Sequence, residues 1–301
     1  AYYGGALSCK QSSPIIRNSS ARNNTGIEGG ALYFYDHSNA TITDIELSQN
    51  TANKGGGVFF NEYSSLTVSM TNISRNVATL GGGGIFCENG STFYMTDSEV
   101  SFNSCYGASW DAFNGGGGIY TGWACSTTIL NSTIRSNYSA GYGGGCRAGG
   151  TDLELSEVMF INNNAVIQGG GLNLQLGQAF VRNSSFIQNK SRMGGALEAS
   201  WVENTTILDN NLFVNNSAEN GGAIQIENSN PVFTRNTISN NAATIQGGGI
   251  WSITSIPVFN QNNIYRNGMG YYNNSDNSVL NLTNNYWGDS SGPYHVAYNT
   301  S

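Results

Sequence analysis

Charged residues are scarce in this 301-residue chain. Asp, Glu, Lys and Arg make up 10% of it, against roughly 25% in an ordinary soluble domain. Lysine occurs only three times, the basic residues do not cluster, and the formal net charge is −7. The phosphate backbone of a nucleic acid would be repelled by such a chain, so we expect no nucleic-acid partner.

Long apolar runs are also lacking. None approaches the ~18 residues of a membrane-spanning helix, so we expect no membrane insertion. Glycine and asparagine are abundant instead, with 40 and 42 residues. Both are poor helix formers, and glycine costs ~1 kcal/mol relative to alanine in a helix interior, which excludes a mostly helical fold. Hydrophobic residues still make up 39% of the chain, which is enough apolar surface to exclude disorder.

The N-terminus shows neither a signal peptide nor an initiator methionine, and we interpret Ala1 as the start of a mature or trimmed product. The chain contains 14 N-glycosylation sequons. Together with few lysines and some cysteines, they favour a secreted, extracellular or cell-surface glycoprotein. Two sequons belong to a ladder described below. We expect covalent N-glycans at the other sites: Asn18, Asn23, Asn39, Asn72, Asn89, Asn131, Asn183, Asn204, Asn215, Asn273, Asn281 and Asn299.

A tandem repeat runs along the chain. Gly-Gly, then Gly or Ala, then an apolar residue recurs at intervals of 25 to 27 residues, with one interval of 34. The long interval carries an insertion over residues 104–114. We call the apolar residue of each repeat the anchor. The anchors are Leu7, Leu32, Val58, Ile85, Ile119, Cys146, Leu172, Leu197, Ile224 and Ile250.

Between the anchors, apolar and polar residues alternate with a period of two, as in Leu66-Thr67-Val68, which is typical of β-strands. A repeat of about 26 residues with three short strands is typical of one coil of a parallel β-helix. One coil cannot bury its inner face alone, so stacked coils must share a core. We therefore predict an all-β parallel β-helix, a solenoid of about 10–11 coils, as one domain over residues 1–301 with a C-terminal cap from about residue 271.

An asparagine recurs once in each repeat. Stacked amide side chains can donate and accept hydrogen bonds from coil to coil, each worth ~1 kcal/mol net. We therefore predict an inward-facing asparagine ladder: Asn24, Asn50, Asn76, Asn103, Asn137, Asn163, Asn189, Asn216, Asn241 and Asn267. Asn137 and Asn189 also lie in sequons. We predict that these two stay unmodified, because a glycan would disrupt the close-packed interior.

In several repeats an aromatic residue, two variable positions and Asn precede the glycine element, as in Phe160–Asn163 before Gly169–Leu172 and Phe213–Asn216 before Gly221–Ile224. This pattern resembles the repeats of chlamydial polymorphic outer membrane proteins, and the chain resembles the right-handed β-helices of the pectin-lyase-like superfamily over residues 4 to about 270. The stretch Asn284–Pro293 is similar to a segment common near the ends of bacterial and archaeal surface β-helices. The resemblance implies a right-handed parallel β-helix, a fold that serves adhesins, structural rods and polysaccharide enzymes alike.

By that resemblance, the polysaccharide enzymes need acidic Ca²⁺ ligands with a basic residue, or clustered Asp with His and an Arg-x-Lys element. This chain has two histidines, near opposite ends, and lacks Asp-Asp, Gly-His-Gly and Arg-x-Lys. We therefore predict a non-enzymatic protein with no catalytic residue, no cofactor and no metal.

Two acidic groups keep an alternative open. Glu198 and Glu227 lie at odd offsets from adjacent anchors, so both should point outward with their backbones ~8 Å apart. That separation suits an inverting glycosidase; the other interpretation is two solvated charges that keep a sheet soluble. Asp152, Glu154 and Glu157 form a further acidic patch that could hold Ca²⁺ weakly.

The five cysteines form no C-x-x-C motif, so structural zinc is not expected. Cys87 and Cys125 lie in adjacent coils a few residues out of register, and we predict a disulfide between them. Cys146 occupies an anchor position, which favours a small buried hydrophobic residue.

The position after each anchor should face outward. In four successive coils it holds Tyr33, Phe59, Phe86 and Tyr120, whose rings would stack at a coil spacing of ~4.8 Å. An exposed aromatic stripe needs a partner. Three interpretations are open: an interface with another protein chain, a platform for sugars, or coverage by the insertion, which carries Trp110 and Phe113.

These observations favour a non-catalytic extracellular β-helix with a structural or adhesive role. Neither end shows an amphipathic capping helix, and the first repeat begins at the N-terminus. Open sheet edges would invite head-to-tail addition of other copies of the chain, so we expect a surface filament or oligomer. The alternative is a polysaccharide-acting enzyme or a carbohydrate-binding module.

Overall fold

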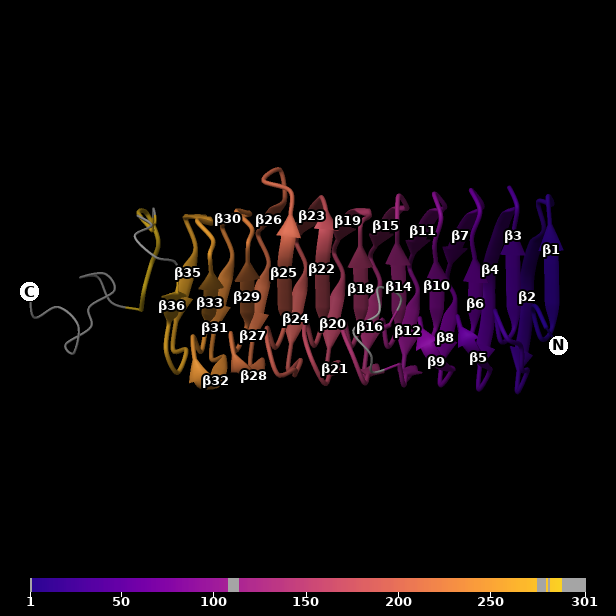
Figure 1. The fold of residues 1–301 in the computed structure, drawn as a ribbon, viewed down its shortest axis with the longest axis horizontal. Helices are drawn as coiled ribbons and strands as arrows, with labels where there is room; N and C mark the ends of the chain where they lie inside the picture. Colours follow the sequence, from indigo (N-terminus) through magenta and orange to yellow (C-terminus); the bar gives the residue numbers. More distant parts are fainter. Residues whose placement is uncertain (1, 108–113, 275–279, 281, 289–301) are drawn as a thin grey trace, which may run out of the picture.

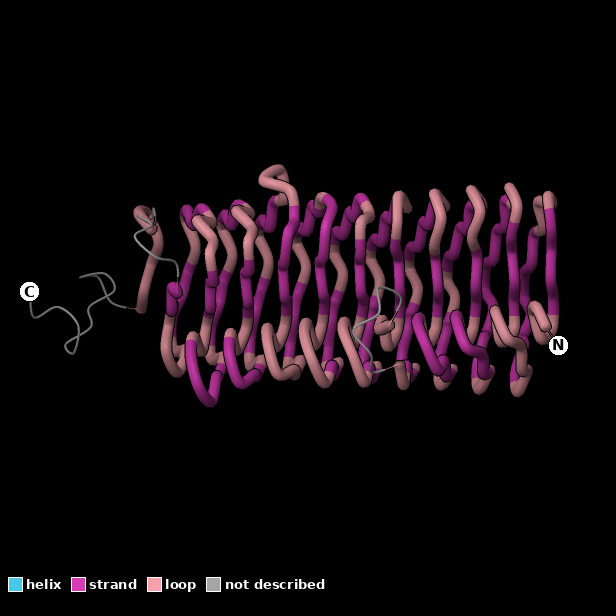
Figure 2. The backbone as a smooth tube through the Cα atoms, viewed as in Figure 1, coloured by secondary structure: helices cyan, strands magenta, loops and turns pink. Residues whose placement is uncertain are grey.

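The computed structural model describes residues 2–107, 114–274, 280 and 282–288, and these residues form a long rod of stacked coils (Figure 1). Strands and turns alternate around each coil (Figure 2), and all the named strand pairs are parallel. The predicted parallel β-helix is therefore confirmed. Within the described part of the chain, no helix is long and apolar enough to cross a membrane.

The anchors lie in an 11-stranded sheet, here called the anchor sheet. Each anchor pairs with the anchor of the next coil, as Leu32 does with Val58. Its strands are β1 (Leu7–Lys10), β3 (Leu32–Tyr35), β6 (Val58–Phe60), β10 (Ile85–Cys87), β14 (Ile119–Gly122), β18 (Cys146–Gly149), β22 (Leu172–Gly177), β25 (Leu197–Val202), β29 (Ile224–Glu227), β33 (Ile250–Ile253) and β36 (Tyr271–Asn274).

A second sheet of 18 strands forms the opposite side of the rod, in most coils with two strands per coil. Its strands are β2 (Ile15–Arg22), β4 (Asn39–Ser48), β7 (Ser65–Ser69), β8 (Asn72–Ser74), β11 (Thr92–Thr96), β12 (Glu99–Ser101), β15 (Ser126–Leu130), β16 (Thr133–Arg135), β19 (Asp152–Ser156), β20 (Met159–Ile161), β23 (Ala179–Arg182), β24 (Ser185–Ile187), β26 (Ile207–Asp209), β27 (Leu212–Val214), β30 (Val232–Thr234), β31 (Thr237–Ser239), β34 (Val258–Asn260) and β35 (Asn263–Tyr265).

Short strands between these two sheets complete the coils. They are β5 (Thr51–Lys54), β9 (Val77–Gly81), β13 (Ser104–Cys105), β17 (Tyr138–Ser139) and β21 (Asn164–Ala165), and the separate pair β28 (Ser217–Asn220) and β32 (Ala242–Gln246). A tight turn leads from each short strand to the anchor sheet. At Gly29, φ is +65° and an added Cβ would lie 2.2 Å from the carbonyl oxygen of Leu32, so only glycine fits this turn.

The inward side chains of the two large sheets form one continuous core. Like residues stack from coil to coil: the rings of Phe160 and Phe186 are parallel, with centroids 4.8 Å apart, and Phe213 continues the stack at the same spacing. Cys146 is buried in the core at its anchor position, as predicted. Each coil buries its apolar face only against its neighbours, so the rod is cooperative along its axis.

The asparagine ladder runs through all ten predicted residues. In each step the backbone N–H and the Nδ2 group of one asparagine donate to Oδ1 of the next, at 2.9–3.1 Å. Nδ2 also donates to a carbonyl one coil back, as from Asn50 to Ala21. The amides therefore satisfy the backbone at a corner where the chain leaves the second sheet.

A second ladder was not predicted. It runs along the other corner of the second sheet through Asn211, Asn236, Asn262 and Asn285, with bonds of 2.8–3.0 Å. In earlier coils the same position holds hydroxyl residues, such as Ser98 and Ser132, that accept from the backbone. The mixture of residue types hides this ladder in the sequence.

Candidate functional site

The positions that follow the anchors form a column on the outer face of the anchor sheet, here called the outer column. Direct register pairs join its members from one coil to the next. After Ser8 in the first coil, it holds in chain order Tyr33, Phe59, Phe86, Tyr120, Arg147, Asn173, Glu198, Gln225 and Trp251. The column is therefore aromatic in its first half and polar in most of its second half.

The aromatic half stacks as predicted, with neighbouring centroids 4.4–5.2 Å apart and planes within 8°. The prediction that Tyr33, Phe59, Phe86 and Tyr120 form an interface is wrong, because each ring is 5% exposed or less. Residues four positions before the anchors reach over this column: the Lys54 ammonium lies 5.0 Å from the centre of the Phe86 ring. Trp110 and Phe113, the proposed cover, lie outside the described residues.

The polar half is equally buried but poorly satisfied. Arg147, Asn173, Glu198 and Gln225 are each 4% exposed or less. Within the described part of the chain, hydrogen-bond partners are lacking for Nε of Arg147, Oδ1 of Asn173, Oε1 of Glu198 and both polar atoms of Gln225. An unsatisfied buried polar group costs ~1–3 kcal/mol. Buried polar groups in such a row are usually satisfied by ordered water or by a bound ligand.

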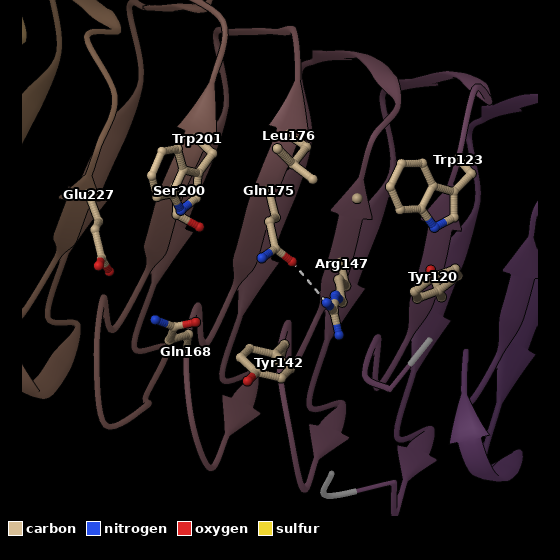
Figure 3. A pocket seen from close by; sticks show the side chains of 11 residues that line it. Tyr120, Trp123, Tyr142, Arg147, Gln168, Gln175, Leu176, Ser200, Trp201 and Glu227 are labelled. Carbon is tan, nitrogen blue, oxygen red and sulfur yellow. Dashed lines mark hydrogen bonds between the residues drawn. The ribbon is translucent and has the colours of Figure 1, made fainter. Parts of the chain in front are cut away.

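A groove of about 320 Å³ lies over this part of the anchor sheet (Figure 3). Arg147, Gln175, Ser200 and Glu227 contribute its polar floor from β18, β22, β25 and β29. Tyr142 and Gln168, from turns before the anchor strands, line the edge opposite Trp123, Leu176 and Trp201 in Figure 3. The groove therefore combines amide, hydroxyl and charged groups with aromatic walls.

Two tryptophans stand at the rim with much of their surface exposed: 50% for Trp123 and 58% for Trp201. The backbone at Trp201 has φ +57° and that at Leu176 has φ +55°. The left-handed conformation costs roughly 1–2 kcal/mol for residues with a Cβ, and bulky residues there are unusual. At the same position other coils place Asp36, Asn89 and Asn228, which suit this turn, and also Gln11, Glu62 and Thr254. Bulky apolar side chains are therefore held at the groove despite local strain.

Arg147 contacts both the floor and the wall of the groove. Nη1 donates to the carbonyl of Asn114, Nη2 donates to Oε1 of Gln175 at 3.0 Å, and the guanidinium lies 4.5 Å from the centre of the Tyr142 ring. Burial lowers the pKa of Arg147. The side chain is thus fixed at one end of the polar row.

Glu198 and Glu227 point outward on adjacent strands, as predicted. Glu198 pairs with Gln225, and Ser200 pairs with Glu227, so the two glutamates are one coil and two residues apart. Glu198 is fully buried, and burial together with the nearby Glu227 carboxylate raises its pKa to about 8, against smaller lowering effects of Ser200, Arg147 and Asn173. Asn173 donates through Nδ2 to Oε2 of Glu198. The interpretation as two solvated charges is therefore wrong for Glu198, while Glu227 is half-exposed and lines the groove.

The structure also locates the other two predicted sites, the acidic patch and the cysteine pair. Among the described residues, no three His, Cys, Asp or Glu side chains form a cluster that could hold a metal ion. Asp152, Glu154 and Glu157 are therefore not gathered as Ca²⁺ ligands, and Glu154 pairs with Arg182. The sulfur atoms of Cys87 and Cys125 lie 3.2 Å apart as free thiols, so their disulfide stays a prediction.

The glycosylation sequons fall into buried and exposed positions, as the register of the coils predicts. Asn137 and Asn189 are buried in the ladder, and Asn273 is half-exposed. Asn281 and Asn299 lie outside the described residues. The remaining sequon asparagines are exposed: Asn18, Asn23, Asn39, Asn72, Asn89, Asn131, Asn183, Asn204 and Asn215.

Comparison with known proteins supports the architecture. Residues 1–115 match a family model described as a right handed beta helix region. The chain is a right-handed parallel β-helix. No curated protein and no solved structure matches it. The likeness to chlamydial proteins therefore remains a resemblance of the repeats, and the function of this β-helix has to be argued from its groove.

Sequence reasoning singled out Glu198, Glu227 and Tyr120 but missed the rest of the groove. Trp123, Gln175 and Trp201 belong to no motif and are brought together only by the stacking of coils. One signal was present: the outer column changes from aromatic to polar between Tyr120 and Arg147. Read along the repeat register, that change marks where the groove floor begins.

Proposed function

We propose that the groove binds an extended glycan. Sugar sites combine aromatic faces, which pack against the apolar faces of sugar rings, with a few fixed polar groups that bind hydroxyls. The observation that carries the proposal is the pair of exposed indoles, Trp123 and Trp201, on a groove whose polar lining includes Arg147, Gln175, Ser200 and Glu227. Sugar hydroxyl groups, which both donate and accept hydrogen bonds, match this mixed lining of guanidinium, amide, hydroxyl and carboxyl groups.

The direction of the groove favours a chain-like ligand. It spans strands β14 to β29 along the rod. Trp123 and Trp201 lie three coils apart in the register, which is ~14 Å at the coil spacing. A linear oligosaccharide lying along the rod would meet both indoles and pass over the polar floor between them.

Binding without cleavage agrees best with the burial of the Glu198 carboxyl. A catalytic acid must reach the glycosidic oxygen, and Glu198 is fully buried. The proposal therefore keeps the expectation of a non-enzymatic protein. A glycan groove on an extracellular rod also suits an adhesive role, in which the rod presents the groove away from its attachment point.

Calorimetry with a panel of linear oligosaccharides tests the proposal. Substituting Trp201→Ala or Trp123→Ala should weaken binding about tenfold or more, since an aromatic contact is worth ~1 kcal/mol beyond its buried area. Phe180→Ala is the matched control, because Phe180 is an exposed aromatic residue on the second sheet. Equal loss in the control, or no binding by any glycan, would refute the groove as a glycan site.

Self-assembly is a second candidate role. Among the residues that the structure describes, strand β1 is the first strand of the anchor sheet and pairs with β3. An edge strand can template the addition of another chain, which supports head-to-tail association of copies into a filament. Electron microscopy of the purified chain tests this role, and monodisperse particles at high concentration would contradict it.

A further inference from the structure

We propose that the groove selects uncharged glycans, and that Glu198, fully buried beneath the floor between Asn173 and Gln225, sets this choice. The inference rests on the proposed function and names the ligand class of the same site. Glu198 acts as a positioning residue, through the floor groups beside it, because its own carboxyl is buried.

The fixed charges at the floor leave little room for an anionic ligand. Arg147 supplies positive charge, and its two terminal nitrogens each donate one hydrogen bond, to Asn114 and to Gln175. Glu227 lines the groove three strands further along. A uronate carboxylate placed between them would lie near the Glu227 carboxylate in a partly dry site, where like charges repel strongly.

The neighbours of Glu198 in the outer column are amides. Asn173 precedes it and Gln225 follows it in register. A protonated carboxyl both donates and accepts hydrogen bonds, as an amide does, whereas a carboxylate only accepts. In its neutral form Glu198 can therefore continue the row that Asn173 begins, toward the unsatisfied Oε1 of Gln225.

Ionisation of Glu198 would change the floor. Its carboxylate would be a buried charge facing Glu227 on β29, with Arg147 two strands away on β18 and the Tyr142 phenol, near Arg192, on the wall. Burying such a charge is costly, so the floor must rearrange or admit water. Ser200 and Glu227, which interact with Glu198 and line the groove, carry that change to the ligand.

The experiment compares calorimetric binding of two oligosaccharides of equal length and linkage, one of neutral hexose and one of the corresponding uronic acid. Each is titrated into wild type, Glu198→Gln and Glu203→Gln at pH 6 and pH 9. Glu203 is an exposed glutamate in the turn just after β25, so Glu203→Gln is the matched control. Circular dichroism confirms that each variant folds.

The neutral oligosaccharide should bind wild type, and its affinity should fall about tenfold from pH 6 to pH 9, since only the neutral fraction of the site is competent. Glu198→Gln should keep the pH 6 affinity and lose the pH dependence, while Glu203→Gln behaves as wild type. The uronic acid should bind at least tenfold more weakly at pH 6.

Three results would overturn the inference while leaving the proposed function intact: tighter binding of the uronic acid, a flat pH profile in wild type, or an unchanged profile in Glu198→Gln. The wild-type profile decides the matter even where Glu198→Gln fails to fold. Absence of binding by both oligosaccharides and by every other glycan of the panel at pH 6 would instead refute the proposed function.

Discussion

The side chain of Asn189 donates through Nδ2 to Oδ1 of Asn216 at 3.1 Å, although Asn189 lies in a glycosylation sequon. The same amide donates to the carbonyl of Phe160. A glycan on Nδ2 would replace one of its two N–H donors and would have to occupy a packed interior. The ladder and the modification therefore exclude each other at this position.

Glycopeptide mass spectrometry of protein from a glycosylating host should find Asn183 modified and Asn189 unmodified. The two sequons lie on the same coil, which makes Asn183 the internal control: it is exposed, whereas Asn189 is buried. Asn131 and Asn137 form a second such pair. A glycan on Asn189 or Asn137 would contradict the inward orientation of the ladder.

Asn163→Ala should destabilise the rod by about 3 kcal/mol or more. Its Oδ1 accepts from Asn137, and its Nδ2 donates to Ile134 and Asn189, and each buried group left unpaired costs ~1–3 kcal/mol. Asn24→Ala, at the less buried end of the ladder, should cost clearly less. Urea denaturation followed by circular dichroism measures both, and a cost near zero for Asn163→Ala would mean that the ladder adds little stability.

Glu198 should make stability fall as pH rises. Its pKa is raised to about 8 in the fold from an ordinary value of 4.5, so the folded chain holds a proton that the unfolded chain releases between these values. Its contribution is present below about pH 4.5 and is lost progressively until about pH 8. Thermal melting of wild type against Glu198→Gln should show a difference that grows across this window and then stays constant; a constant difference throughout would contradict the buried acid.

Trp201→Asn should stabilise the rod while it removes glycan binding. Asn tolerates a positive φ, and Asn89 and Asn228 occupy the same turn position in other coils. Relief of backbone strain at such a site is worth at most the roughly 1–2 kcal/mol that the left-handed conformation costs, and gains of this kind often reduce function. Melting and calorimetry on one preparation test both effects. A destabilised variant would show that the indole contributes packing that outweighs its strain.

Cys87 and Cys125 should form a disulfide under oxidising conditions. Their sulfurs lie 3.2 Å apart, and hydrogen bonding to Cys87 lowers the pKa of Cys125, which favours the thiolate that attacks an oxidised small-molecule disulfide. Mass spectrometry should find these two linked and Cys146, buried in the core, still a thiol. Two free thiols after prolonged oxidation would contradict the pairing.

The repeat predicted the fold because it fixes side-chain direction. Period-two alternation sets inward and outward positions within a coil, and the constant spacing sets the register between coils, so the ladder from Asn24 to Asn267 followed from the sequence. The groove did not follow from the sequence, because it depends on how the turns fold over the outer face of the anchor sheet. Lys54 reaches Phe86 and Tyr142 reaches Arg147 across this fold-back, and no local pattern encodes such contacts. The burial of the aromatic stripe depends on the same fold-back, so the sequence left three interpretations of the stripe open.

A crystal structure of the chain soaked with a linear neutral oligosaccharide below pH 7 would show whether the groove binds glycans. We expect sugar density along β18, β22, β25 and β29, with rings against Trp123 and Trp201 and hydroxyls directed toward Gln175 and Ser200. Sugar bound on the second sheet, with the groove left empty at a saturating concentration, would contradict it.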